Sequence, residues 1–294
     1  MSDKAQQVYI DGEFFHESNA KISVFDHGLL YGDGVFEGIR FYNDRVTCLE
    51  EHIDRLFDSA KAIHLEIPAG HDEVRNMVLE TIRRNQLHDG YVRLVVTRGT
   101  GGLGLSPYRC EKASVIVIAS TISLYPQEKY DQGLILATCA TRRPTHDSLS
   151  PSVKSLNYLS NVMAKVEALA SGAEEGVMLN TEGYVAECTG DNIFVVKDGI
   201  ILTPTVASGS LNGITRRVVI DLAIKAGFEL KEIQMNRYDM YTADELFLTG
   251  TAAEVVPVAQ YDKRIIGQGK PGPVTKQLIE DYRNLVETTG TPIY

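Results

Sequence analysis

One lysine stands out in the sequence because its neighbours carry no charge. From Ser148 to Ala164 the chain reads SLSPSVKSLNYLSNVMA, and Lys154 is the only charged residue of this stretch. A surface lysine normally has charged neighbours, whereas burial disfavours the ammonium form and leaves a nucleophilic amine that is suited to a Schiff base. The alternative is a solvated lysine at the start of a helix, which is the commoner state of this residue type.

The residue four positions further on is the second candidate. We expect a helix from about Ser155 to Ser171, closed by Gly172, and residues four apart share one face of a helix. The phenol of Tyr158 would therefore lie beside the amine of Lys154 and donate a hydrogen bond to an oxygen of the same ligand.

Two charged side chains each have a functional and an ordinary interpretation. Arg55, in HIDRL, lies on the side of a predicted helix opposite Ile53 and Phe57. It either pairs with Glu51 in solvent or binds a phosphate with both arms of its guanidinium. Glu187, in GYVAECTGDN, falls on a predicted strand, where it is either an exposed charge or a carboxylate that holds the proton of a pyridine nitrogen.

Two loops of small residues are candidates for an anion site. The run Leu211-Asn-Gly-Ile-Thr215 opens a predicted helix, where free N–H groups and the helix dipole favour a phosphate, and Thr215 adds a hydroxyl. The run Gly250-Thr-Ala-Ala253 follows a predicted strand and offers the hydroxyl of Thr251. Taken alone, each loop is more often an ordinary cap or turn.

Other motifs argue against several enzyme classes. Residues Gly99 to Gly104 match G-x-G-x-x-G, but Ser106-Pro107 and another strand follow where a dinucleotide site requires a helix. We therefore expect a hairpin loop there. The seven histidines show no paired-ligand spacing, so we expect no metal, and no nucleophile elbow or Walker loop is present.

The charge balance and the hydropathy pattern limit the partners. The 294 residues include 29 Lys and Arg against 39 Asp and Glu, a net charge of −10, so we expect no nucleic-acid or membrane partner. No apolar run approaches the roughly 20 residues of a membrane span, and MSDKAQQVYIDGEFF does not resemble a signal peptide. The four dispersed cysteines contain no C-x-x-C pair, and we expect reduced thiols in a cytoplasmic protein.

Hairpins interleaved with helices predict the fold class. Turns at Asp11-Gly12 and Asn43-Asp44 indicate two hairpins, and EGVMLN-TEG-YVAECT and NIFVV-KDG-IILTP indicate two more. Apolar periodicity predicts helices over residues 50–64, 71–87, 155–171, 211–227 and 272–290. Further strands are expected over residues 91–99, 112–120, 133–141 and 244–251. This order lacks strict β-α-β alternation and so predicts an α+β fold.

A turn-rich segment, SLYPQEKYDQG, divides the chain. We expect a small N-terminal domain over residues 1–122, a connection over 123–133 and a larger cofactor-binding domain over 134–294.

Taken together, the motifs resemble a known family. YGDGVFEGIR (31–40), HIDRL, the isolated lysine followed by N-Y-L, EGYVAE, LNGITR and GTAAEV are similar to those of the branched-chain amino acid aminotransferases. These are fold-type IV pyridoxal-phosphate enzymes, and the motifs occur in the family's order over nearly the whole chain. The resemblance implies a small N-terminal α/β sandwich, a larger C-terminal pseudo-barrel domain with the cofactor between them, and a homodimer or higher oligomer.

The resemblance also implies roles for individual residues. Lys154 would form the Schiff base with pyridoxal 5'-phosphate and shuttle the proton, Glu187 would bind the pyridine nitrogen, and Tyr158 would bind the phenolic oxygen. The remaining cofactor contacts would come from Arg55, Leu211, Gly213, Ile214, Thr215 and Thr251. The substrate would contact Tyr31, Phe36, Tyr91, Arg93, Tyr125, Thr251 and Ala252.

The run after Glu37 favours the branched-chain subclass. D-amino-acid aminotransferases and aminodeoxychorismate lyases usually differ directly after this residue, whereas this chain has Gly-Ile-Arg40. The expected reaction is amino transfer between L-leucine, L-isoleucine or L-valine and 2-oxoglutarate. A D-amino-acid or R-amine aminotransferase is the alternative, and a non-catalytic binder on the same scaffold is a further one. Some members line the pocket with a Trp, and this chain has none, which leaves the substrate range open.

Overall fold

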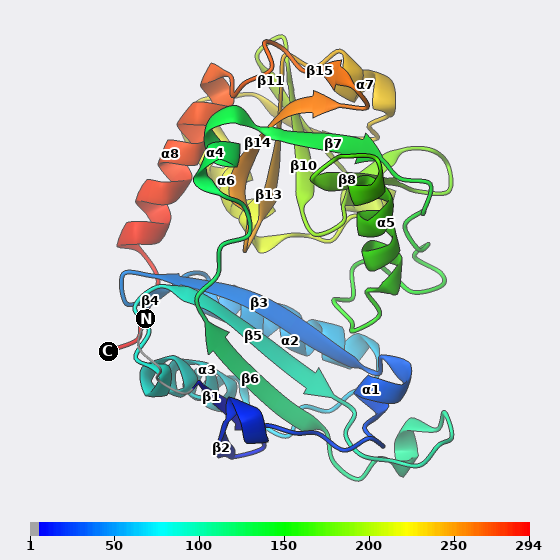
Figure 1. Cartoon of the computed structure of the whole chain (residues 1–294), viewed down its shortest axis with the longest axis vertical. Helices are drawn as coiled ribbons and strands as arrows, with labels where there is room; N and C mark the ends of the chain where they lie inside the picture. Colours follow the sequence, from blue (N-terminus) through cyan, green and yellow to red (C-terminus); the bar gives the residue numbers. More distant parts are fainter. Residues whose placement is uncertain (1–5) are drawn as a thin grey trace. The chain divides into compact units, whose positions relative to one another are not determined.

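The computed structural model describes residues 6–294, which divide into two compact units (Figure 1). The first unit contains the chain up to Ile122 together with Val153–Asn157 and Val286–Tyr294. The second contains Ser123–Ser152 and Tyr158–Leu285. The division after residue 122 coincides with the expected one, but the two short segments differ from it. Both make backbone hydrogen bonds to strands of the first unit, which a linear division of the sequence does not anticipate.

The first unit is built on a seven-stranded antiparallel sheet with the order β16-β4-β3-β5-β6-β1-β2. Its helices α2 and α3 pack on the sheet through contacts with β3 and with β6 and β1. The elements are β1 (Gln7–Ile10), β2 (Glu13–His16), α1 (His27–Tyr31), β3 (Gly34–Tyr42), β4 (Arg45–Val46), α2 (Leu49–Ala62), α3 (His71–Asn85), β5 (Gly90–Thr97), β6 (Ser114–Ser120) and β16 (Thr291–Pro292).

The two N-terminal hairpins form as predicted, at β1–β2 and β3–β4. The turn residues Asn43 and Asp44 have φ values of 46° and 63°, which is the backbone that a two-residue turn between twisted strands requires. The loop after β5 leads to a short 3-10 helix at Pro107–Arg109 and then to β6. The expectation of a hairpin loop at Gly99–Gly104 is therefore confirmed.

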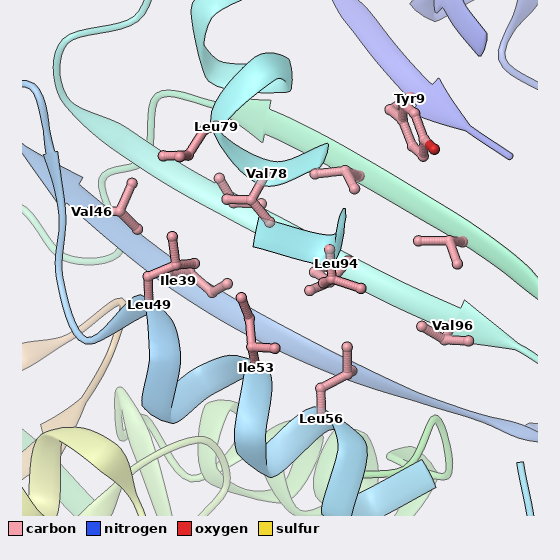
Figure 2. Close-up of a cluster of buried hydrophobic side chains, with 14 of the residues drawn as sticks. Tyr9, Ile39, Val46, Leu49, Ile53, Leu56, Val78, Leu79, Leu94 and Val96 are labelled. Carbon is pink, nitrogen blue, oxygen red and sulfur yellow. The ribbon is translucent and has the colours of Figure 1, made fainter. Parts of the chain in front are cut away.

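The core of the first unit lies between the sheet and its helices. Figure 2 shows Leu49, Ile53 and Leu56 of α2 directed at the sheet, where they meet residues such as Ile39 of β3. Each of these four side chains is at most 1% exposed. The three helical positions recur every three or four residues, which is the apolar stripe of a helix with one buried face.

The second unit is built on a nine-stranded mixed sheet with the order β12-β11-β10-β13-β14-β7-β8-β9, and β15 pairs with β14. Strand β9 also contacts β10 and β11, so the sheet curls back on itself. The elements are α4 (Gln127–Gln132), β7 (Leu134–Thr138), α5 (Leu159–Ala170), β8 (Glu175–Leu179), β9 (Val185–Cys188), β10 (Asn192–Lys197), β11 (Ile200–Pro204), α6 (Ile214–Lys225), β12 (Leu230–Ile233), α7 (Arg237–Tyr241), β13 (Glu245–Gly250), β14 (Glu254–Tyr261), β15 (Arg264–Ile265) and α8 (Pro273–Thr288).

Two expectations about helices need correction. The helix predicted from Ser155 begins at Leu159, and the connection after Ile122 contains the short helix α4. Lys154 therefore precedes the helix, and its four-residue spacing to Tyr158 does not place the two side chains on one helical face. The reason is that the backbone of residues 154–156 pairs with β3 instead of forming helical hydrogen bonds.

Among residues 6–294, no helix is long and apolar enough to cross a bilayer, and no group of three or more His, Cys, Asp or Glu side chains is arranged to hold a metal ion.

Candidate active site

Lys154 is fixed at the open edge of β3. Among the described residues of β3, only Phe41 and Tyr42, at its far end, pair with β4, so the first residues of β3 have no strand partner on that side. The Lys154 segment pairs with them instead. The N–H of Phe36 donates to the carbonyl of Lys154 at 3.0 Å, and the N–H of Leu156 donates to the carbonyl of Gly34 at 2.9 Å. Two backbone hydrogen bonds therefore set the position of the lysine.

The side chain of Lys154 lies over an aromatic ring. Its Nζ is 4.5 Å from the centre of the Phe36 ring, and the guanidinium of Arg93 lies 4.6 Å from the same centre. Lys154 is half-buried. The amine of Lys154 and the guanidinium of Arg93 thus share one aromatic ring, which places a nucleophile and a cation close together.

Tyr91 and Arg93 extend this group along β5. They pair with Arg40 and Gly38 of β3, and residues paired across antiparallel strands point to the same face of the sheet. The guanidinium of Arg93 is 5.5 Å from the centre of the Tyr91 ring. The structure thus brings together four predicted residues, namely Lys154, Phe36, Tyr91 and Arg93, which we call the Lys154 group.

Gly38 allows Tyr91 to lie close to β3. A Cβ atom at this position would lie 1.8 Å from the hydroxyl oxygen of Tyr91. The phenol therefore crosses the strand where there is no side chain.

Arg55 is held by a buried acid on the opposite face of β3. Its Nε and Nη2 donate to the two carboxylate oxygens of Glu37, each at 2.7 Å, and Nδ1 of His52 lies 2.7 Å from the same carboxylate. The side chain of Glu37 is fully buried, and that of Arg55 is 14% exposed. The interpretation of Arg55 as a solvated side chain is therefore wrong, since it is mostly buried and pairs with Glu37 on the neighbouring strand.

The protonation of Glu37 and His52 follows from their burial and from their contacts with each other and with Arg55. Burial raises the pKa of Glu37, but the charges of Arg55 and His52 and their hydrogen bonds outweigh it and lower this pKa to about 2. Burial lowers the pKa of His52, and the attraction of Glu37 only partly offsets this effect. A neutral His52 that donates from Nδ1 to an ionised Glu37 fits both directions.

Tyr31 supports a loop of the first unit. Its hydroxyl donates to the carbonyl of Leu103 at 2.6 Å, and its ring packs edge-on against His27 with the ring centres 5.0 Å apart. The contacts of this predicted substrate residue are thus with His27 of its own helix α1 and with the segment between β5 and β6.

The second unit holds Glu187 in a buried polar network. Glu187 is 6% exposed, so it is not the exposed strand-end charge that was its ordinary interpretation. Nη2 of Arg143 lies 2.8 Å from its Oε1. The N–H of Leu211 and Nδ2 of Asn192 donate to its Oε2 at 2.8 Å and 3.2 Å. Both oxygens accept hydrogen bonds, which is the arrangement of an ionised carboxylate.

Arg143 is itself fixed by two further groups. Its Nε donates to the carbonyl of Gly209 at 3.2 Å, and its Nη1 donates to Asn161 at 3.1 Å. Asn161 in turn donates to the carbonyl of Thr189 at 2.7 Å. We call Glu187, Arg143, Asn161, Asn192 and Leu211 the Glu187 group.

The loop after Leu211 ends at the N-terminus of α6. Gly213 is the N-cap, and Ile214 and Thr215 are the first two helical residues, both buried. Within the described part of the chain, no side chain caps this end and no acid lies in its first turn. The backbone N–H groups of this helix end suit an anion.

Both small-residue loops are closely packed against the start of β10. A Cβ on Gly213 would lie 2.0 Å from Oδ1 of Asn192, and a Cβ on Gly250 would lie 2.0 Å from Oδ1 of Asp191. Thr251 and Ala252, as predicted, fall in the turn between β13 and β14.

Two tyrosines of the second unit have distinct surroundings. Tyr125 is buried in the core of this unit, and its hydroxyl lies 3.4 Å from Oε2 of Glu175. Burial, with nearby carboxylates such as Asp191, raises its pKa. Tyr158 is the half-buried residue directly before α5.

These features fit the groups of pyridoxal phosphate. The capless end of α6 and the loop with Gly213 form a cradle for a phosphate, and a buried carboxylate suits a protonated pyridine nitrogen. The half-buried lysine amine suits an aldehyde. The fit rests on the chemistry of these donors and acceptors within each unit.

Sequence reasoning missed four of the residues that hold these groups, namely Glu37, His52, Arg143 and Asn192. One signal was present for Glu37, which is the only acid in the apolar strand GVFEGIRFY. A lone acid on a buried strand requires a cationic partner. Arg143 gave no such signal, because its partner Glu187 lies far from it in the sequence. Asn192 is close to Glu187 in the sequence, but nothing there marks its carboxamide as a partner of Glu187 and Leu211.

Comparisons with known proteins identify what the chain resembles. The sequence model of the family described as "Amino-transferase class IV" matches residues 34–261. A protein of Methanocaldococcus jannaschii named "Putative branched-chain-amino-acid aminotransferase" is 49% identical over 288 residues, which cover 98% of this chain and 99% of that protein. The "Branched-chain-amino-acid aminotransferase" of Escherichia coli is 36% identical over 96% of this chain and 93% of its own length.

Solved structures give the same result for the fold. A branched-chain amino acid aminotransferase of the organism abbreviated T.th., with pyridoxamine 5'-phosphate, has a TM-score of 0.93 at 39% identity, and it covers 97% of this chain and 95% of its own. The Escherichia coli branched-chain enzyme has a TM-score of 0.94 at 36% identity, with 97% of each chain covered. The T.th. enzyme is also solved with N-(5'-phosphopyridoxyl)-L-glutamate, with a TM-score of 0.91 at 38% identity over 97% of this chain and 95% of its own.

Proposed function

The chain belongs to the class IV aminotransferases, and on that premise we propose which of its residues transfer the amino group and how. It is a fold-type IV enzyme whose cofactor is pyridoxal 5'-phosphate, and it exchanges amino groups between L-leucine, L-isoleucine or L-valine and 2-oxoglutarate. The observation that carries the residue assignment is Lys154, fixed by backbone hydrogen bonds on β3 with its amine over Phe36.

We assign the cofactor contacts to individual residues. Lys154 binds the aldehyde carbon, and the Glu187 carboxylate binds the proton on the pyridine nitrogen. Tyr158 binds the phenolic oxygen and Leu211 packs on the ring. The phosphate is held by the following set: Arg55, Gly213, Ile214, Thr215 and Thr251. When bound, the cofactor supplies an electron sink for the carbanion that forms at the substrate Cα.

Two groups of the chain then control protons. Nζ of Lys154 would accept the proton that leaves the substrate Cα and would donate it to the aldehyde-derived carbon of the cofactor in the same half of the reaction. Arg143, Leu211 and Asn192 bind the Glu187 carboxylate and favour its ionised form. The negative charge of Glu187 would in turn keep the pyridine nitrogen of the cofactor protonated. The chain positions the reacting groups and supplies charges, whereas the cofactor supplies the electron sink.

A site for both leucine and glutamate requires apolar walls and one cation. We propose that Phe36, Tyr31 and Tyr91 form walls and that Arg93 binds the side-chain carboxylate of glutamate. Thr251 and Ala252, in the turn after β13, are assigned to the substrate as well. Tyr125 is the weakest member of this set, since its hydroxyl is turned toward Glu175.

An absorbance spectrum of the purified protein tests this function. With bound pyridoxal phosphate the protein should be yellow, and L-leucine should remove the yellow band by converting the cofactor to its amino form. Addition of 2-oxoglutarate should restore the band. D-alanine and an R-amine are the comparison donors, and a spectrum that responds to them but not to L-leucine would replace the L-specific assignment with the alternative one.

A second copy of the chain is the expected partner. Helix α5 carries a stripe of exposed apolar residues, namely Leu159, Val162, Met163, Val166 and Leu169, which are each at least 48% exposed. They recur every three or four residues, the spacing of one helical face. A contiguous apolar face is typical of an interface, and we propose that it pairs with a second protomer in a homodimer.

Val166→Asp tests the dimer. A charge in the middle of this stripe should convert the dimer to a monomer in sedimentation equilibrium, because an unpaired charge at an apolar interface is strongly unfavourable. Ile224→Asp is the matched control, since Ile224 is a 60% exposed residue on α6 outside the stripe. If both variants sediment as the wild type does, α5 is not the interface.

We further propose that the protein works in the cytoplasm, where its four cysteines stay reduced. All four are free thiols, and Cys139 and Cys188 are buried.

A further inference from the structure

Asn192 contacts two groups that have separate roles in the proposed function. It is the first residue of β10 and is 6% exposed. Its Nδ2 donates to the carbonyl of Leu211 at 2.9 Å and to Oε2 of Glu187 at 3.2 Å. The N–H of Leu211 donates to the same Oε2 at 2.8 Å. Asn192, Glu187 and Leu211 therefore form a closed ring of hydrogen bonds.

The other end of the same side chain limits the position of the loop. Oδ1 of Asn192 lies where a Cβ on Gly213 would be only 2.0 Å away, so the backbone of Gly213 rests against the carboxamide. Asn192 thus contacts Glu187 and Leu211 through its side-chain nitrogen, and it contacts Gly213 through its side-chain oxygen. One rigid carboxamide spans the gap between the acid and the helix start.

We propose that Asn192 is a positioning residue that fixes the Glu187 carboxylate relative to the loop Leu211–Thr215. The pyridine nitrogen and the phosphate of one cofactor molecule are then bound at a set separation. This inference rests on the proposed function, because that function assigns the nitrogen to Glu187 and the phosphate to the loop. Asn192 itself acts through these neighbours and touches neither reacting atom.

The chemistry of the contacts requires an amide at position 192. The nitrogen faces two acceptors, a carbonyl and a carboxylate, so it must be a donor. An aspartate of the same shape would put a third oxygen against those two and repel Glu187. An alanine would remove the links but introduce no repulsion, and the buried acceptors would lose a partner.

Two variants therefore test the proposal. Asn192→Asp keeps the shape of the side chain and adds a negative charge, whereas Asn192→Ala removes the carboxamide and adds no charge. The first measurement is the dissociation constant of pyridoxal phosphate from the reconstituted enzyme. The second is the ¹⁵N chemical shift of the pyridine nitrogen in labelled bound cofactor, which reports whether Glu187 still holds its proton. We expect Asn192→Ala to weaken binding about tenfold, the usual effect of losing a hydrogen bond to a charged group. Asn192→Asp should weaken binding further and shift the nitrogen signal toward its unprotonated value.

Thr203→Val is the matched control. Thr203 is fully buried in the adjacent strand β11 and donates to the carbonyl of Ile193 at 2.8 Å, so its loss removes a buried hydrogen bond of the same sheet pair. This variant should lower thermal stability but leave the cofactor affinity and the nitrogen signal at their wild-type values. A purely structural Asn192 would behave in the same way.

Gly213→Ala provides a test that keeps Asn192 in place. The backbone of Gly213, with φ −62° and ψ 139°, accepts an alanine, so the added methyl acts mainly by displacing the Asn192 oxygen. It should weaken cofactor binding in the wild type and have less effect in the Asn192→Ala background. Gly190→Ala, where a Cβ meets nothing within 4 Å, is its control.

The outcomes separate the inference from the function on which it rests. Wild-type affinity and nitrogen signal in both Asn192 variants, or an Asp variant that is milder than the Ala variant, would overturn the positioning role. If the Asn192→Asp protein does not fold, Gly213→Ala decides. An equal effect on cofactor affinity in the wild type and in the Asn192→Ala variant would also overturn the positioning role. A wild-type protein that binds no pyridoxal phosphate would contradict the proposed function instead.

Discussion

The orientation of Arg55 is fixed because a single buried acid accepts hydrogen bonds from both Nε and Nη2 of its guanidinium. Two 2.7 Å hydrogen bonds join it to the carboxylate of Glu37 on the neighbouring strand. An arginine held in this way loses little conformational entropy when it binds a further anion. The residue proposed to bind phosphate is therefore already oriented by the fold.

Replacing Glu37 with Gln should destabilise the protein by about 3 kcal/mol. The change removes one partner of a buried ion pair and leaves the charge of Arg55 without this counter-ion. Urea unfolding at neutral pH measures the cost. Asp58→Asn, a neutral substitution on the exposed part of α2, should cost less than about 0.5 kcal/mol. A variant as stable as the wild type would show that Glu37 is not a charged partner of Arg55.

Glu37→Gln should also change how the free energy of unfolding depends on pH. The pKa of Glu37 is lowered from 4.5 to about 2 in the folded protein, so between these values the unfolded chain binds the proton first. The stabilisation by Glu37 is complete above about pH 4.5 and is lost as the pH falls toward 2. Because Gln does not titrate, the difference in unfolding free energy between wild type and Glu37→Gln should narrow over this range. A constant difference from pH 5 to pH 2 would contradict the assignment.

At the scale of elements, the position of Lys154 depends on strand pairing and not on a helix. The sequence around it has the composition of a helix start, and local propensity favours a helix from Ser155. The first residues of β3, however, have open backbone groups along one edge, and the lysine segment satisfies them. A pairing partner more than a hundred residues away cannot be inferred from local periodicity, which explains why the helix begins later than predicted.

The hairpins and amphipathic helices were predictable because their signals are local. Asn43-Asp44 requires left-handed backbone, and the stripe of Leu49, Ile53 and Leu56 recurs with the helical period. Strand β14 was not predicted, although it is buried and pairs with both β13 and β7. Its sequence EVVPVAQY contains a proline, which lowers the strand signal.

Gly38→Ala tests the packing of β5 on β3. The new methyl would lie 1.8 Å from the Tyr91 hydroxyl, at the far end of a side chain that can turn about its own bonds, so the fold should tolerate the change while the phenol is displaced. We expect kcat/KM for L-leucine to fall about tenfold to a hundredfold with unchanged affinity for pyridoxal phosphate. Gly102→Ala, where a Cβ meets nothing within 4 Å, is the control. Wild-type kinetics in Gly38→Ala would remove Tyr91 from the substrate site.

At the scale of the whole molecule, an acidic protein serves ligands that are themselves anionic. The chain has a net charge of −10, yet the cofactor carries a phosphate and one substrate is a dicarboxylate. The explanation is local, because each unit concentrates a few cations and helix N–H groups where its proposed ligand atoms bind. Lys154, Arg93 and Arg55 provide them in the first unit, and the N-terminus of α6 provides them in the second.

The distance between two partners in the sequence explains which features of the site the sequence alone could predict. The family motifs identify the enzyme class and predict which lysine holds the cofactor, because each motif is contiguous. The partners Glu37 for Arg55 and Arg143 for Glu187 join segments 18 and 44 residues apart, and only the folded sheet brings them together. The missing Trp changes the expected substrate range but not the catalytic assignment.

The most direct test of the account is to find which lysine holds the cofactor. The purified yellow protein is reduced with borohydride, digested and mapped by mass spectrometry, with Lys165 and Lys129, which are paired with Glu175 and Glu174, as internal comparisons. We predict that the phosphopyridoxyl group is on Lys154 alone and that Lys154→Ala has lost the label and the amino-transfer activity. A label on another lysine, or a Lys154→Ala protein that turns over L-leucine at the wild-type rate, would contradict it.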